Sequence, residues 1–75
     1  MGLSIKTTNE LVELAKAGGG FVLDVGRRNT DELVRIAAAA RKSGTTIIFR
    51  NMAVRKNESL IKIAEAGKRH VIFES

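Results

Sequence analysis

Basic residues occur in adjacent pairs along this chain, and basic side chains are the type that binds phosphate groups. The four pairs are Arg27–Arg28, Arg41–Lys42, Arg55–Lys56 and Lys68–Arg69. The formal net charge of +5 and the pI of about 10.3 permit binding to nucleic acid or to an acidic protein. The same charge also keeps a small protein soluble, so composition leaves both interpretations open.

Their positions relative to the expected helices divide these cations into two groups. One group follows helix C-termini, where cations complement the negative end of the helix dipole: Lys16, Arg41, Lys42, Lys68 and Arg69. The other group follows strands and precedes helix N-termini: Arg27, Arg28, Arg55 and Lys56. Open parallel sheets bind ligands at the carboxyl ends of their strands, and helix N-termini favour phosphates. The second group is therefore a candidate phosphate or nucleic-acid rim, although Asp31, Glu32 and Glu58 partly cancel its charge.

Few other residues have types that could carry out catalysis. Asp24 and Glu74 could act as an acid pair, but as alternating partners of Lys6 and Arg50 they are explained more simply. His70 has no nearby Ser or Cys nucleophile signature, so no catalytic triad is indicated. The stretch AGGGF follows an expected helix and precedes a strand, which is the reverse of a phosphate loop. We therefore expect no enzyme activity and no cofactor.

The composition also restricts the class of protein. Cysteine is absent and histidine occurs once, which excludes disulfides, thiolate metal sites and a histidine cluster within one chain. No apolar run approaches the roughly 20 residues that span a bilayer. The start MGLSIKTTNE lacks the pattern of a signal peptide. We expect a cytoplasmic protein with no metal site and no membrane partner.

Three stretches of the chain align with one another, and each reads as a helix followed by a strand. They are NELVELAKAGGGFVLDV, DELVRIAAAARKSGTTIIFR and ESLIKIAEAGKRHVIFE. Each has an acidic residue, a short apolar motif that ends in alanine, a glycine, and a β-branched or aromatic run. In its general plan this repeat resembles leucine-rich repeats of the ribonuclease-inhibitor type, although their asparagine pattern L-x-x-L-x-L-x-x-N is absent.

Start and stop signals place helices near 8–17, 30–43 and 58–66. Thr7 with Glu10 and Asn29 with Glu32 have the spacing of capping boxes. The third helix is expected to begin after Asn57. Glycines that favour a left-handed helix stop follow each helix: Gly18, Gly44 and Gly67.

Four strands are expected near 3–6, 21–26, 45–50 and 70–74. Alternate strand residues face opposite sides of a sheet, and one side is wholly apolar: Leu3, Ile5, Leu23, Val25, Ile47, Phe49, Val71 and Phe73. A doubly wound sheet is apolar on both faces, so the mixed second face indicates that all three helices lie on one side. We predict one α/β domain over 1–75, with a four-stranded parallel sheet in the order 1-2-3-4 and an open second face.

The open face is the candidate interaction face. It carries an apolar stripe and a row of charges of alternating sign: Val22, Ile48 and Ile72, then Lys6, Asp24, Arg50 and Glu74. Bare apolar patches tend to mark interaction sites, and a chain of 75 residues has a thin core. The last strand, in HVIFES, is a second candidate because neither proline nor lysine protects its edge.

Three hypotheses for the function follow. The leading one is a small α/β interaction module that forms a homo-oligomer and has no catalytic activity. The alternative is a nucleic-acid-binding protein that uses the basic loops at the C-terminal ends of the strands. The third is a fragment or designed relative of a repeat protein without a biochemical role of its own.

Overall fold

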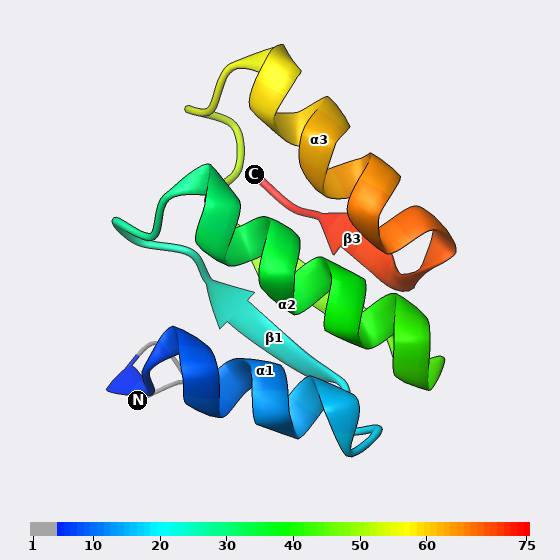
Figure 1. Cartoon of the computed structure of the whole chain (residues 1–75). Helices are drawn as coiled ribbons and strands as arrows, with labels where there is room; N and C mark the ends of the chain where they lie inside the picture. The colour runs from blue at the N-terminus through cyan, green and yellow to red at the C-terminus, as the bar shows by residue number, and fades with distance from the viewer. Residues whose placement is uncertain (1–4) are drawn as a thin grey trace.

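The computed structural model describes residues 5–75 and contains three helices that alternate with three strands (Figure 1). Their order is α1 (Thr8–Lys16), β1 (Phe21–Asp24), α2 (Thr30–Ser43), β2 (Ile47–Arg50), α3 (Asn57–Gly67) and β3 (Val71–Phe73). A 3-10 turn, η2 (Lys68–His70), joins α3 to β3. These boundaries lie within two residues of the predicted ones.

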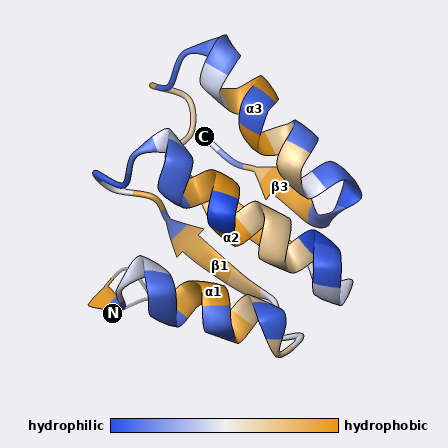
Figure 2. Ribbon diagram, viewed as in Figure 1, coloured by the Kyte–Doolittle hydropathy of each residue, from blue (hydrophilic) through white to orange (hydrophobic). Residues whose placement is uncertain are grey.

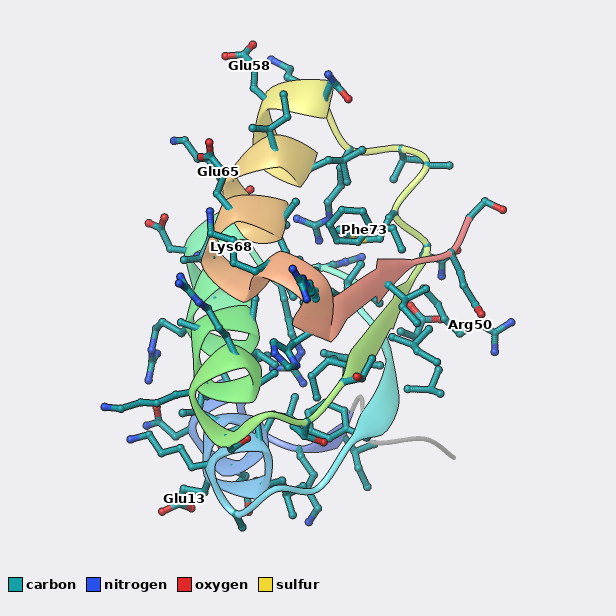
Figure 3. All side chains as sticks on the ribbon, turned by 90° about the vertical axis from the view of Figure 1, so that its right-hand side faces the viewer. Glu13, Arg50, Glu58, Glu65, Lys68 and Phe73 are labelled. Atoms are coloured by element: carbon teal, nitrogen blue, oxygen red, sulfur yellow. The ribbon has the colours of Figure 1, made fainter. Side chains whose placement is uncertain are left out.

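The three strands form one parallel sheet in the order β1-β2-β3. Its register places Val22 opposite Ile48 and Ile48 opposite Ile72, with Asp24 opposite Arg50. All three helices lie on the same side of this sheet, as a view along the layers shows (Figure 3). The predicted α/β fold, with parallel strands and helices on one face, is therefore confirmed in this coarse form.

The fourth strand, predicted near 3–6, is not present in the described residues. Leu3 and Ser4 lie outside them, whereas Ile5 and Lys6 are described and form no strand. Ile5 is 73% exposed, and the carbonyl oxygen of Lys6 accepts a hydrogen bond from the Arg28 side chain. The pattern behind this predicted strand consisted of only two alternating apolar residues, Leu3 and Ile5. A pattern this short is too weak a signal to define a strand. The four-stranded, repeat-like layout is therefore not confirmed.

The core lies between the sheet and the helix layer. The apolar strand face predicted from parity contributes fully buried side chains, among them Leu23, Ile47 and Phe49. The helices oppose them with Leu11, Leu33, Ile36 and Ile63. Ala37 and Ala40 are also fully buried in α2, and their small side chains let this central helix approach both neighbours. Figure 2 shows the resulting contrast between hydrophobic strands and hydrophilic helix ends.

The first two helix starts form as predicted. The Glu10 N–H donates to Thr7 Oγ1 at 3.2 Å, and the Thr7 N–H donates to Glu10 Oε1 at 2.9 Å. Asn29 and Glu32 exchange the same two bonds at 2.9 Å each. The prediction for the third start is wrong, because Asn57 is already helical. Lys56 precedes α3 there without a side-chain capping bond.

Two of the three glycines predicted as left-handed helix stops have that conformation, and the third does not. Gly18 and Gly44 adopt left-handed φ values of 91° and 81°, as predicted. Gly67 does not, because it stays inside α3 with φ −95° while Lys68 takes φ 52°. A Cβ atom at Gly67 would lie 2.5 Å from Val71 Cγ1 and 3.2 Å from Ala37 Cβ. Glycine is therefore needed here for close packing rather than for a left-handed stop.

Candidate interaction surfaces

The predicted apolar stripe lies on the sheet face that faces away from the helices. Val22 and Ile72 are 47% and 48% exposed, and Ile48 between them is half-buried. The register places the three side chains next to one another across the strands. Within residues 5–75 no helix or strand covers this face. The structure thus gathers the apolar part of the predicted interaction face.

The charged row forms at the carboxyl ends of the strands, with the predicted pair of Arg50 and Glu74 but with a different partner for Asp24. Arg50 Nε lies 3.3 Å from Glu74 Oε1, and Figure 3 shows Arg50 pointing away from the helix layer. Both side chains are about half exposed or more, so this ion pair contributes at most about 1 kcal/mol. Asp24 instead accepts hydrogen bonds from Asn51 Nδ2, at 2.9 Å to each carboxylate oxygen. Lys6 is not part of the row, because it belongs to no strand.

Asn51 is a residue of this surface that the sequence analysis missed. It has a left-handed φ of 67°, which asparagine tolerates better than most residues. Together with Asp24, Arg50, Glu74 and Ser75 it lines an open depression of about 530 Å³. In the sequence, the only sign of this role was that Asn51 directly follows the strand predicted near 45–50. The depression holds polar groups that already bond to one another.

Two cations of the candidate rim are held by hydrogen bonds within the protein. Arg28 Nη1 donates to Thr8 Oγ1 at 2.8 Å, and its Nη2 donates to the Lys6 carbonyl. Arg55 Nη2 donates to the Arg28 carbonyl at 2.5 Å. These bonds tie the loops after β1 and β2 to the start of α1. Arg28 and Arg55 therefore anchor loops, which a phosphate ligand would have to disturb.

The other two rim cations, Arg27 and Lys56, are exposed, and in the described part of the chain their side chains form no hydrogen bond or ion pair.

Acidic groups lie close to this rim. The Thr8 hydroxyl, followed by the Asn29 N–H, lowers the pKa of Glu32. The Thr7 N–H, followed by its hydroxyl, lowers the pKa of Glu10. Both carboxylates therefore stay ionised at neutral pH and weaken the positive potential of the rim.

His70, for which the sequence indicated no role, has a partner. Its Nδ1 lies 2.9 Å from the Thr45 carbonyl oxygen. A carbonyl oxygen can only accept, so Nδ1 carries the proton and donates. This bond joins η2 to the loop before β2. His70 is thus a structural link at the end of the molecule opposite to the rim.

No family model, curated protein or solved structure matches this chain. Among residues 5–75, no group of three or more His, Cys, Asp and Glu side chains could hold a metal ion. No helix in that same range combines the length and the apolar character needed to cross a bilayer.

Proposed function

We propose that this protein is a small interaction module that self-associates through the open face of its sheet. The observation that supports this proposal is the stripe of Val22, Ile48 and Ile72, which lies in register on a face that no described element covers. Complete burial of a Val or Ile side chain contributes roughly 1.5–3 kcal/mol. Covering the exposed half of Val22 and of Ile72 would therefore contribute on the order of 1 kcal/mol each, and covering Ile48 would contribute less.

The shape of the molecule suits a second copy as the occupant. The Cα atoms span 29 × 27 × 18 Å, as expected for a slab of one helix layer and one sheet. The open sheet face lies on the broad side of this slab, which is the largest side that a partner could cover. Two such slabs would stack sheet on sheet about 10 Å apart, with a helix layer on each outer side. The apolar stripe of each copy would then be covered.

The charges of the face select one arrangement of the two copies. If the strands of both copies ran in the same direction, Arg50 would lie over the partner's Arg50, and the two cations would repel each other. If the strands run in opposite directions, the stripes still coincide, and Arg50 lies over the partner's Thr46 instead. Thr46 is exposed and precedes β2. We therefore expect a two-fold dimer with antiparallel strands and with each charged row at the periphery.

Sedimentation equilibrium over about a hundredfold range of concentration tests this proposal. The wild type should form dimers with an affinity in the micromolar range or weaker, because association costs offset much of the buried apolar surface. A variant with Val22→Thr, Ile48→Thr and Ile72→Thr should be monomeric. Threonine keeps the β-propensity and approximate shape of these side chains, so the sheet should persist.

A matched control changes three exposed apolar residues outside the sheet: Ile5→Thr, Val54→Thr and Ile61→Thr. This control should dimerise like the wild type. A wild type that stays monomeric throughout the range contradicts the proposal. Dimers that persist in the sheet-face variant also contradict it, and the edge of β3 would then become the candidate interface.

A further inference from the structure

The net positive charge of the protein is concentrated at one end of the molecule. Five exposed cations lie at or just after the C-terminal ends of the three helices: Lys16, Arg41, Lys42, Lys68 and Arg69. The chain has 13 Lys and Arg and 8 Asp and Glu. Without these five cations, equal numbers of each sign remain. The group is called the basic end below; the exposed Glu13 and Glu65 of the same helix ends reduce its five positive charges by two, to a net formal charge of +3.

The fold brings these cations together from distant parts of the chain. All three helices run in the same direction and end at the same side of the molecule (Figure 1). Figure 3 looks onto this side and shows Lys68 in the foreground, with Glu13 at the lower margin. In the described residues, none of the five cations forms an ion pair or hydrogen bond. Glu13 and Glu65, three residues before Lys16 and Lys68, pair with neither cation.

The negative ends of the helix dipoles do not cancel this charge. Each helix contributes the equivalent of about half a negative charge at its C-terminus. Three helices thus offset roughly 1.5 of the five positive charges. Glu13 and Glu65 offset two more, so a net positive charge of roughly 1.5 remains available to a ligand. At the opposite rim, Glu10 and Glu32 are held ionised by hydrogen bonds near the cations, whereas in the described part of the chain Glu13 and Glu65 form no ion pair with the basic end.

Hydrogen bonds hold the basic end in a fixed arrangement. The Ser43 hydroxyl donates to the Ala15 carbonyl at 2.5 Å, which joins the end of α2 to the end of α1. His70 donates to the Thr45 carbonyl at 2.9 Å, which joins η2 to the loop after α2. Both bonds are partly buried. The helix ends and the turn that carry the cations therefore need little further ordering when a rigid anion binds.

We propose that the basic end binds the phosphate backbone of double-stranded nucleic acid without sequence preference. Thr45 and Thr46 follow α2 at this end, and threonine hydroxyl groups can donate to phosphate oxygens as Lys and Arg do. Contacts to phosphates set position and affinity but carry no base information. The inference is independent of self-association, because the basic end lies outside the open sheet face.

Two other anionic partners fit these residues less well. Single strands are bound by stacking on exposed aromatic rings, but Phe49 is fully buried, and Phe21 and Phe73 pack against the core. Membrane surfaces are bound by basic regions with apolar side chains that insert. The loops 17–20 and 44–46 and the turn 68–70 contain no large exposed apolar residue. Binding to the phosphate backbone of a duplex requires neither exposed aromatic rings nor inserting apolar side chains.

Fluorescence anisotropy with a labelled random-sequence DNA duplex of about 20 bp tests the proposal, between roughly 50 and 200 mM salt. For the wild type, we expect the slope of log K against log salt to approach about −4.5, or about −0.9 for each of five phosphate contacts. The variant with Arg41→Gln, Lys42→Gln, Lys68→Gln and Arg69→Gln should lose most of this slope and at least about tenfold in affinity at the lower salt.

The matched control removes four exposed cations elsewhere: Lys6→Gln, Arg27→Gln, Lys56→Gln and Lys62→Gln. It should keep the wild-type slope and bind within about threefold of the wild type. Equal losses in both variants would show that net charge alone matters, and would overturn the proposal. A wild type that fails to bind duplex at the lower salt would overturn it too. So would binding to vesicles with about 30% phosphatidylserine but not to duplex.

Two double variants keep the test decisive if the quadruple variant unfolds. Arg41→Gln with Lys42→Gln and Lys68→Gln with Arg69→Gln should each lose roughly two fifths of the slope. Circular dichroism confirms that each double variant is folded before binding is measured. Two folded double variants with the wild-type slope would overturn the proposal.

Discussion

The Thr8 hydroxyl, at the start of α1, donates a 2.6 Å hydrogen bond to Glu32 Oε2 in the first turn of α2. Glu32 Oε1 accepts from the Asn29 N–H at 2.9 Å, so one carboxylate both caps its own helix and binds the neighbouring one. Arg28 Nη1 donates to the same Thr8 oxygen at 2.8 Å. The starts of α1 and α2 are therefore connected by a chain of side chains 20 to 24 residues apart in sequence.

This contact makes the free energy of unfolding depend on pH. Hydrogen bonds from Thr8 and Asn29 lower the pKa of Glu32 in the folded state. The resulting stabilisation is complete above the unfolded-state pKa of about 4.3, and it is lost as the pH falls through the lowered folded-state pKa. Glu32→Gln should therefore lose less stability than the wild type between about pH 6 and pH 3. Urea unfolding at a series of pH values measures the difference.

Thr8→Ala provides the control for this prediction, because it removes the largest cause of the lowered pKa. When both proteins also carry Thr8→Ala, the free energies of unfolding with Glu and with Gln at position 32 should differ less in their pH dependence. If the unfolding midpoints of wild type and Glu32→Gln stay parallel from pH 6 to pH 3, Glu32 does not contribute as described.

Gly67→Ala should destabilise the protein, although alanine normally stabilises a helix interior by about 1 kcal/mol relative to glycine. The added methyl group would overlap Val71 and press on Ala37. Overpacking of this kind costs roughly 1–3 kcal/mol. Urea unfolding should show the loss. The control Gly26→Ala adds a methyl group in open space at φ 55°, and it should cost only about 1 kcal/mol of backbone strain. A Gly67→Ala variant more stable than wild type would refute the packing argument.

Arg55→Gln should lower the free energy of unfolding by about 1 kcal/mol, because glutamine is too short to reach the Arg28 carbonyl. Arg27→Gln removes the same charge from an exposed side chain without a hydrogen bond, and it should change stability by less than about 0.5 kcal/mol. Chemical unfolding of both variants at the same salt concentration compares them. Equal effects would mean that charge, rather than the hydrogen bond, decides the outcome.

The melting temperature of the wild type should rise with protein concentration if the protein self-associates, because dimerisation stabilises the folded state by mass action. Scanning calorimetry over about a hundredfold range of concentration measures this shift. The variant with threonine at positions 22, 48 and 72 should melt at a temperature independent of concentration. A wild-type melting temperature without concentration dependence would count against the dimer.

The local sequence determined the helices, the three strands and the sidedness of the sheet. Capping boxes at Thr7 and Asn29 act over three residues, and their geometry follows from spacing alone. Strand parity depends on the two-residue period of a strand, so the buried positions of Leu23 and Phe49 could be read directly. The apolar stripe of the open sheet face was predictable for the same reason.

The tertiary structure alone decided which cations are engaged and which remain available. Arg28 and Arg55 resembled free loop cations in sequence, but their bonds join residues that are 20 and 27 positions apart along the chain. Gly67 resembled a helix stop until Val71 and Ala37 packed against it. The basic end exists because three helices, separated by strands in sequence, end side by side. Contacts of this range depend on how elements pack, which no local pattern of residues encodes.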